Sequence, residues 1–469
     1  MKQFYLSFSV MALLIGCRSE PSVEPIALHP DNPHYFLYKG NPVVLITSGE
    51  HYGAILNLDF DYAKYFKTLA DDELNLTRVF TGAYVEPVGA FRIEQNTLAP
   101  KPERFICPWQ RSDTPGYASG GNKFDLSKWN DEYFTRLKDF MAEADKRNVI
   151  VELALFCPFY EDTQWKISPM NDGNNINGGG PADRTHVYTL DKSKSLLGVQ
   201  ENLVRKIVQE LKGYSNLIYE ICNEPYFGGV TMEWQHHIAT LIREEEKDFP
   251  HKHLISQNIA NGAKKIEGPH PSVSIYNFHY AAPPVAVAQN YHLNKVIGDN
   301  ETGFDGNADS TYRKEGWDFI LAGGALYNNL DYSFTVEHEN GTFQYPSTQP
   351  GGGTVKLRQQ LSYLQEFISG FDYLKMKPDT TVVTNRAELK STHVLAESGK
   401  QYGIYIWGKG PHNLTLSLPA GTYEVEFMDP ISGHTEKRQP LTYSEGITLS
   451  TPSYDEDVAI RLVNTNRRQ

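Results

Sequence analysis

The sequence has 469 residues, with 44 basic and 57 acidic side chains, so its formal net charge is −13. Hydrophobic residues make up 40% of the chain and aromatic residues 12%, which is typical of a folded globular protein and excludes a disordered or collagen-like one. The acidic balance and the lack of a long Lys/Arg run argue against a surface that follows a phosphate backbone, so no nucleic acid partner is expected.

The N-terminal residues have the pattern of an export signal. Lys2 precedes an apolar stretch, Phe4 to Ile15, that is too short to span a bilayer comfortably. The overlapping Leu14-Ile15-Gly16-Cys17 resembles the lipobox of bacterial lipoproteins, in which the cysteine becomes the lipidated first residue. Residues 1–17 are therefore predicted to be a lipoprotein-type signal peptide with its lipidation cysteine. The protein is expected to be an outer-membrane or cell-surface lipoprotein that touches the membrane only through this anchor. The alternative is an ordinary secretory signal and a periplasmic protein.

Residues 25–374 alternate short β-rich runs with longer amphipathic segments. The predicted strands are 43–47, 76–80, 149–156, 217–222, 254–256, 273–279, 295–298 and 324–327. Helical patterns, with apolar residues at every third or fourth position, cover 62–70, 129–146, 196–211, 232–247 and 312–321. Eight β-then-α units predict a closed (β/α)8 TIM barrel. A doubly wound open sheet is the alternative, but it would normally carry a glycine-rich turn after the first strand, and none is present.

The C-terminal part, residues 380–466, has a different pattern. Short β-rich runs at 394–396, 403–407, 413–418, 422–428, 447–449 and 458–463 are separated by turns that contain Pro and Gly. This pattern predicts a small antiparallel β-sandwich that packs against the barrel as a rigid accessory. A glycan-binding role for the sandwich is a further hypothesis, since fold alone does not give function.

Two glutamates follow predicted barrel strands at the ends where reactive groups collect. Asn223-Glu224-Pro225 comes directly after the fourth strand, and Glu301 comes after the seventh. One carboxyl group can give a proton to a leaving oxygen while the other, ionised, attacks an anomeric carbon. At a separation of about 5–5.5 Å such a pair suits a retaining glycosidase. Other carboxylates that compete for the role of Glu301 are Asp299, Glu337 and Glu339.

These motifs resemble the clan of retaining glycoside hydrolases with catalytic glutamates on strands four and seven, and most of all its cellulase-type family 5. The resemblance implies that Glu224 is the acid/base, that Glu301 is the nucleophile and that Asn223 binds the sugar 2-hydroxyl. It also implies that Arg78 supports the nucleophile, in agreement with the fixed positive charge that an arginine offers to a nearby carboxylate.

The chain departs from the family pattern at two places. His279 and Tyr280 resemble the His and Tyr that follow strand six in the family, but there the two usually stand two positions apart and here they are adjacent. Many relatives carry a tryptophan on strand eight whose ring forms the floor of the sugar site, whereas this chain has Tyr327 in that region. The sugar platform is therefore expected from Tyr327, from Trp317 or from another loop.

Further residues near the predicted mouth are candidates for substrate contacts. Glu50 and His51 follow strand one, and Glu86 follows strand two. Trp109 and Trp165 lie on the long loops after strands two and three, where aromatic faces can stack on sugar rings. Ordinary packing is the alternative for each of these side chains.

The sequence predicts neither a metal nor a cofactor. Cys107, Cys157 and Cys222 lack the close spacing of a zinc site or a disulfide framework and are expected to be buried. The prediction is a retaining glycoside hydrolase whose partner is a poly- or oligosaccharide. A non-catalytic surface glycan-binding lipoprotein is the alternative, and transglycosylation in place of hydrolysis would use the same residues.

Overall fold

The computed structural model describes residues 24–444 and 448–465, so the predicted signal and lipidation site at 1–17 lie outside the described residues. Its central feature is a sheet of eight parallel strands in the order β4-β13-β12-β11-β10-β9-β8-β5. In chain order these are β4 (Leu45–Gly49), β5 (Leu76–Phe80), β8 (Ile150–Phe156), β9 (Leu217–Cys222), β10 (Leu254–Asn261), β11 (Ile275–His279), β12 (Val296–Thr302) and β13 (Leu326–Leu330). Each of the eight predicted strands overlaps one of them.

The sheet closes into a barrel between β4 and β5, which no ladder joins directly. The side chain of Asn75, just before β5, accepts a hydrogen bond from the N–H of Ile46 and donates one to the carbonyl of Val44, both at 2.9 Å. At the other end of β5, the N–H of Phe80 donates to the carbonyl of Tyr52 at 3.0 Å. The predicted TIM barrel is therefore confirmed. Because all eight strands are parallel, their carboxyl ends gather at one mouth.

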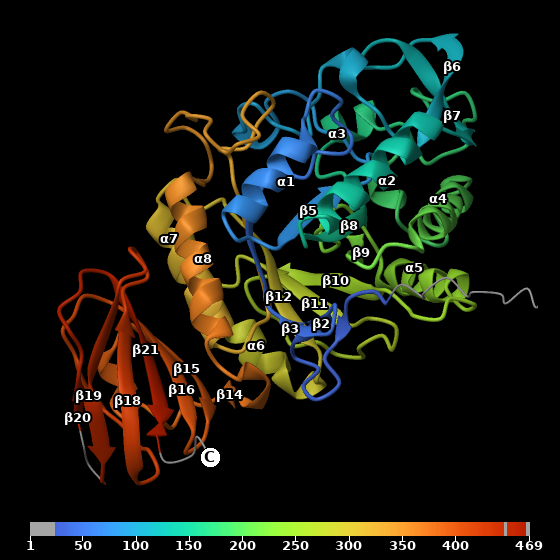
Figure 1. The fold of residues 1–469 in the computed structure, drawn as a ribbon. Coiled ribbons are helices and arrows are strands. Elements are labelled where there is room, and N and C mark those ends of the chain that lie inside the picture. Colours follow the sequence, from blue (N-terminus) through green and yellow to red (C-terminus); the bar gives the residue numbers. More distant parts are fainter. Residues whose placement is uncertain (1–23, 445–447, 466–469) are drawn as a thin grey trace, which may run out of the picture.

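Helices surround the barrel (Figure 1). They are α1 (Tyr62–Asp71), α2 (Asp131–Asp145), α3 (Asp162–Ile167), α4 (Leu196–Leu211), α5 (Met232–Glu245), α6 (Val285–Asn290), α7 (Asp309–Leu321) and α8 (Val355–Ser369). Side-chain caps begin several of them: Asn130 accepts from two N–H groups of α2, and Thr231 accepts from one of α5. Within the described part of the chain, no helix is long and apolar enough to cross a membrane.

The fifth β-then-α unit departs from the prediction. Residues 262–274, between β10 and β11, form no helix. This segment contains Gly262, Gly268, Pro269 and Pro271, and glycine and proline are the residues that most strongly disfavour a helix interior. The expectation of eight complete β-then-α units is therefore wrong at this one position. The barrel itself does not depend on that helix, because β10 and β11 pair directly.

Two smaller sheets lie outside the barrel. An antiparallel sheet of β1 (Ala27–Leu28), β2 (Phe36–Tyr38) and β3 (Asn41–Val43) leads into the start of β4, and it divides the strand predicted at 43–47. The long loop after β5 carries an antiparallel hairpin of β6 (Trp109–Pro115) and β7 (Asn122–Trp129), which the sequence did not predict. The short 3-10 turns are Ala90–Arg92, Pro102–Arg104, Arg184–His186, Tyr291–Leu293, Tyr373–Lys375 and Arg386–Glu388.

The C-terminal region is an antiparallel sandwich, as predicted. A six-stranded sheet has the order β14-β15-β16-β21-β18-β19, and a two-stranded sheet of β17 and β20 faces it across an apolar core. The strands are β14 (Lys377–Pro378), β15 (Ser391–Glu397), β16 (Gln401–Trp407), β17 (Asn413–Thr415), β18 (Gly421–Met428), β19 (Thr435–Tyr443), β20 (Thr448–Ser450) and β21 (Asp457–Asn464). The sequence did not predict β19, because most of its side chains are exposed and it lacks an apolar alternation.

The sandwich packs against the barrel helices α7 and α8 (Figure 1). Trp317 of α7 stacks on Tyr405 of β16, with ring centroids 5.4 Å apart. Arg313 of α7 forms two hydrogen bonds of 3.0 Å to Asp457 of β21. The apolar core of the barrel continues into this side of the six-stranded sheet. The predicted packing of the sandwich on the barrel is confirmed, and Trp317 is used there and not at a sugar platform.

Candidate active site

A β-bulge in β12 decides which side chains point into the barrel. The pairing of β12 with both neighbouring strands shifts register between Asp299 and Thr302. As a result Asn300 and Glu301, although adjacent, both reach polar partners inside the barrel, whereas Asp299 accepts from the N–H of Ala281. A regular strand would alternate its side chains between the two faces, and a bulge is the usual way to re-aim one of them. Asp299, which competed with Glu301 for the role of nucleophile, therefore does not reach the mouth.

Glu301 lies among hydrogen-bond donors. One carboxylate oxygen accepts from Arg78 at 2.9 Å and from the Tyr52 hydroxyl at 3.0 Å, and the other accepts from the Tyr280 hydroxyl at 2.7 Å. Burial by itself would raise the pKa of Glu301, but His279, Arg78 and these hydrogen bonds outweigh it and hold the pKa well below its usual range. Glu301 is therefore ionised at neutral pH.

Glu224 follows β9 with a positive φ of 35°, an uncommon backbone conformation for a residue other than glycine. Its N–H donates to the side chain of Asn258 at 3.0 Å, which fixes this turn. Its carboxyl oxygens accept from the Tyr160 hydroxyl at 2.6 Å and from the Tyr226 hydroxyl at 3.2 Å. The side chain is thereby held at the mouth by residues that follow β8 and β9.

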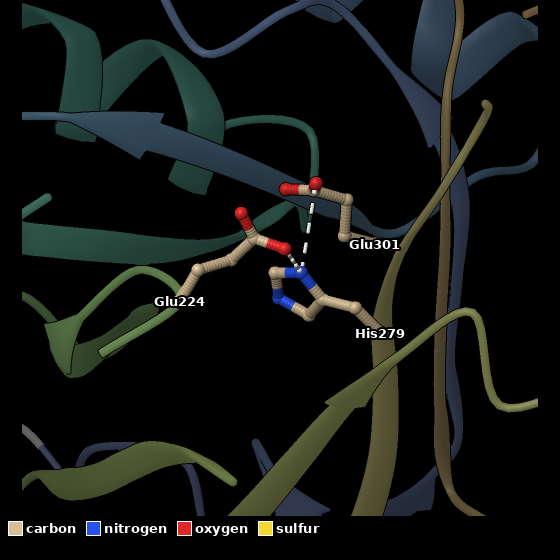
Figure 2. A group of neighbouring side chains, drawn as sticks. All are labelled: Glu224, His279 and Glu301. Carbon is tan, nitrogen blue, oxygen red and sulfur yellow. Dashed lines mark hydrogen bonds and ion pairs between the residues drawn. The ribbon is translucent and has the colours of Figure 1, made fainter. Parts of the chain in front are cut away.

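His279 lies between the two glutamates, as Figure 2 shows. Its Nδ1 is 3.2 Å from an oxygen of Glu224 and 3.5 Å from an oxygen of Glu301, and the three nearest atoms lie within 4.8 Å of one another. Burial by itself would lower the pKa of His279. The charge of Glu301 and the hydrogen bonds to both glutamates outweigh burial and raise this pKa to about 10. His279 is therefore protonated at neutral pH, and its Nδ1–H serves both carboxyl groups.

Arg78 of β5 is fully buried beneath the pair. Its guanidinium donates two hydrogen bonds to Glu220 of β9, one to Glu301 and one to the side-chain oxygen of Asn223. The side-chain nitrogen of Asn223 in turn donates to the Tyr160 hydroxyl at 2.8 Å. A planar guanidinium binds several acceptors in fixed directions, so Arg78 sets the positions of all three partners.

The two glutamates line one cleft of about 280 Å³ at the mouth of the barrel. Its other lining residues are His51, Tyr52, Phe80, Glu86, Phe91, Leu98, Cys157, Tyr160, Asn223, Phe227, Asn261, Tyr280 and Phe304. A concave site with apolar walls and a few converging polar groups is typical of a small-molecule or sugar site. Of the residues named from the sequence, the structure brings Glu224, Glu301, Asn223, Arg78, His279, Tyr280, His51 and Glu86 to this region.

Four residues expected near the substrate are instead used for packing. Glu50 is buried and accepts from the N–H groups of Gly53 and Ala54, and burial raises its pKa to about 7. Buried aromatic side chains that do not line the cleft are Trp109 in β6, Trp165 in α3 and Tyr327 in β13. Trp165 donates to the carbonyl of Ala182, and Tyr327 donates to that of Tyr312. Loop tryptophans are as useful for burying a long loop as for stacking on a ligand, so their place could not be decided from the sequence.

Several further residues at the site were not predicted from the sequence. Tyr52, Tyr160 and Tyr226 donate to the two glutamates, and Glu220 holds Arg78. Three partly exposed phenylalanines, Phe91, Phe227 and Phe304, provide apolar surface at the mouth in place of a tryptophan. Tyr52 and Tyr226 follow the ends of β4 and β9 within a few residues, and this was the available signal.

Glu224, His279 and Glu301 are also close enough together to be considered as metal ligands. A protonated imidazole has no free lone pair on Nδ1, and Arg78 already places a positive charge against Glu301. The three groups therefore fit proton transfer better than cation binding. The absence of a metal cofactor remains a prediction from the sequence.

Comparison with known proteins gives no match to a sequence family or to a curated protein. The structure is similar to a protein of Bacteroides vulgatus provisionally named a glycoside hydrolase, with a TM-score of 0.67 and 13% identity over 94% of this chain and 83% of that one. A glycoside hydrolase family 5 protein of the same species gives 0.66 and 12%, covering 95% and 94%. A family 5 mannosidase of Rhizomucor miehei gives 0.50 and 13%, covering 74% and 100%.

These similarities concern the fold, because the sequence identities are low. The chain has the barrel fold of family 5 glycoside hydrolases, as the resemblance of its motifs implied. The two Bacteroides proteins match nearly the whole chain, so the similarity includes the C-terminal sandwich.

Proposed function

We propose that this protein is a retaining glycoside hydrolase that cleaves a poly- or oligosaccharide by double displacement. The observation that carries the proposal is the geometry of Glu224 and Glu301, which line one cleft with carboxyl oxygens within 4.8 Å of each other. Retaining enzymes hold their carboxyl groups about 5–5.5 Å apart, whereas inverting enzymes need about 6.5–9.5 Å to admit a water molecule between them.

The two glutamates have different environments, as double displacement requires. Glu301, kept ionised by Arg78 and two tyrosines, attacks the anomeric carbon while Glu224 gives its proton to the departing oxygen. Glu301 is then esterified and Glu224 carries the negative charge. Glu224 next takes a proton from water, and the resulting hydroxide oxygen bonds to the anomeric carbon and releases Glu301. The Nδ1–H of His279 can follow the charge between the two carboxyl groups without moving, because it reaches both.

Asn223 is proposed to bind the sugar 2-hydroxyl, as the family resemblance implies. Its side chain lines the cleft beside Glu224, and Arg78 and Tyr160 fix its orientation. A hydrogen bond to the 2-hydroxyl that strengthens in the transition state supplies part of the catalysis in such enzymes.

The proposal also includes export and lipid anchoring through Cys17. We expect labelled palmitate to be incorporated by the wild-type chain and not by the Cys17→Ala variant.

The experiment is a screen of activated aryl glycosides of different sugars, with the product anomer followed by NMR. We expect a product of retained configuration and a loss of activity on the order of 10⁴-fold or more in Glu301→Gln. Glu224→Gln should lose about 10²–10⁴-fold on substrates with poor leaving groups and much less on those with good ones, because only the former need a proton. Glu337→Gln, an exposed carboxylate that does not line this cleft, is the matched control.

Two outcomes would contradict the proposal. An inverted product would exclude the covalent intermediate on Glu301. Binding of glycans without any product, unchanged in both variants, would favour the alternative of a surface glycan-binding lipoprotein.

A further inference from the structure

The mouth of the barrel is roofed on one side. The loop after β5 and the loop after β13 are joined, because the side-chain amide of Gln349 accepts from the N–H of Glu94 at 3.0 Å and donates to its carbonyl at 3.4 Å. In the same loop after β5, the ring of Phe91 lies edge-on to Phe304, which follows β12, at 6.4 Å. The loops of β12, β13 and β5 are thus joined across one half of the mouth.

The two ends of the cleft differ accordingly in exposure. At the roofed end the wall residues His51, Glu86 and Leu98 are 7%, 5% and 1% exposed, while the rim residues Phe91 and Phe304 are 40% and 37% exposed. At the other end, near β9 and β10, Phe227 is 44% exposed and Asn261 is exposed as well. The cleft is therefore closed toward β4 and β5 and open toward β9 and β10.

The two glutamates are arranged along this axis. Glu301 accepts from Tyr52 and Arg78, on the β4 and β5 side, as well as from Tyr280. Glu224 accepts from Tyr160 and from Tyr226, and Tyr226 also bonds to Asn261 at the open end. The group that protonates the leaving oxygen lies on the leaving-group side of the scissile bond. The departing part of the substrate thus extends toward the open end, and the sugar attacked at its anomeric carbon extends toward the closed end.

We infer that the cleft receives the non-reducing end of a glycan and that the enzyme releases the terminal sugar, with Glu86 and His51 binding the hydroxyls of that sugar. This inference rests on the proposed function, because it takes Glu224 as the acid. A cleft that cleaves internal bonds needs both ends open, since the chain must continue past the attacked sugar in both directions. In this inference the joined loops after β5 and β13 block the end of the cleft at β4 and β5, where the wall residues are buried.

The closed end has the groups needed to bind hydroxyls. Glu86 already accepts from the Tyr84 hydroxyl at 3.0 Å and from the side chain of Asn96, so its position in the wall is fixed. The Nε2 of His51 is 3.5 Å from Glu86, and its Nδ1 is buried with no partner in the described part of the chain. A buried polar atom without a partner is costly, and a sugar hydroxyl would satisfy it.

The same end also selects the charge of the terminal sugar. Glu86, Glu224 and Glu301 all line the cleft, and the two positive groups beneath them, Arg78 and His279, are already used by the glutamates. A uronic acid would bring a further carboxylate toward Glu86. The terminal sugar is therefore inferred to be neutral.

The test is a time course of the wild-type enzyme on a linear neutral oligosaccharide of the sugar found in the aryl glycoside screen. One sample has a free non-reducing end and the other carries a cyclic acetal on that end. From the first sample we expect only monosaccharide and the oligosaccharide shortened by one sugar at the earliest times, and cleavage of the blocked sample should be at least 100-fold slower. Internal fragments from either sample would overturn the inference while leaving the proposed function intact. No product from any aryl glycoside would overturn the proposed function, and the inference with it.

A pair of variants tests the role of Glu86 in the wall of the cleft. Glu86→Gln should raise KM for the unblocked oligosaccharide about tenfold or more, because a charged acceptor is lost. Tyr84→Phe, which removes only a neighbour of Glu86, should have a smaller effect in the same direction. An unchanged KM in Glu86→Gln, in protein with the wild-type circular dichroism spectrum, would contradict the assignment of Glu86.

Discussion

Arg78 at the mouth and Arg313 at the sandwich interface are both buried arginines, and each pairs with two acidic side chains. Arg78 binds Glu220 and Glu301, and Arg313 binds Asp457 and Glu456. The difference is in what lies beyond the carboxylates. Glu301 faces a cleft, whereas Asp457 is completely enclosed and also accepts from the Tyr405 hydroxyl at 2.8 Å.

The comparison shows that a buried ion pair by itself does not indicate a functional site. At the interface the pair joins α7 to β21 and satisfies every group that it buries. At the mouth the arginine holds a carboxylate in its ionised form against a cavity that a ligand can enter. The distinction lies in access to a ligand, and it predicts that the two arginines fail in different ways when they are replaced.

The largest effect on stability is expected for Arg313→Met. Removing the arginine leaves the buried Asp457 without its cation, and breaking a buried pair in this way costs about 3–5 kcal/mol. Urea unfolding should show this loss, while kcat on an aryl glycoside at 25 °C stays at the wild-type value. Lys314→Met is the matched control, because the only carboxylate paired with Lys314 in the described part of the chain is the partly exposed Glu456, and the loss of this pair should cost less than about 1 kcal/mol. A large fall in kcat for Arg313→Met would show that activity depends on the arginine at the interface as well as on the arginine at the mouth.

Arg78→Lys is expected to affect activity more than stability. Lysine keeps the charge but loses the planar set of donors, so the pKa of Glu301 should rise toward its ordinary value. Because the proposed nucleophile must be ionised, activity should be present above this pKa and lost below it. The acid limb of the kcat/KM profile should therefore move to higher pH, with a fall of about 10–100-fold at the optimum.

Arg358→Lys provides the control for that experiment. Arg358 is another buried arginine, paired with Asp331 and Asp72 away from the cleft. Its replacement should lower stability and leave the acid limb in place. If both variants moved the acid limb equally, Arg78 would have no special relation to Glu301.

The smallest effect concerns Glu315 of α7, whose carboxyl group has no basic partner among the residues that the structure describes. Burial raises its pKa to about 9, and Asp299, Asp305 and Asp318 add to the shift. Between pH 4.5 and 9 the unfolded chain releases this proton while the folded chain keeps it, so stability present below pH 4.5 is lost as the pH rises. Glu315→Gln should therefore raise Tm at pH 8 by about 2 °C relative to wild type and change it less at pH 5. An equal shift at both pH values would exclude titration of Glu315 as the cause.

Much of the barrel could be predicted because its strands are buried on both faces and read as β-rich runs. The prediction was weakest where side chains are exposed or segments lack a period. The hairpin of β6 and β7, the strand β19 and the non-helical segment 262–274 are of this kind. The hydrophobic pattern of a sequence reflects which side chains are buried, so an element with few buried side chains gives only a weak pattern.

The aromatic residues at the site show a second limit. Trp109 and Trp165 were expected at the mouth because they lie on loops after barrel strands, but both are buried under those loops. The rim instead carries Phe91, Phe227 and Phe304. Which aromatic side chain of a long loop faces inward depends on how the loop folds back on the barrel, and no repeat in the sequence encodes this.

The sequence by itself determined the order of the eight strands and which residues follow them, because parallel strands in a barrel bring their carboxyl ends together whatever the loops do. It therefore located Glu224, Glu301 and Arg78 in one region. Only the tertiary structure decided that Glu301 and not Asp299 faces the cleft, since the bulge in β12 breaks the alternation of side chains. The tertiary structure also decided which end of the cleft the loops cover, because this depends on contacts between residues of different loops. Glu94 and Gln349, for example, are 255 positions apart in the sequence.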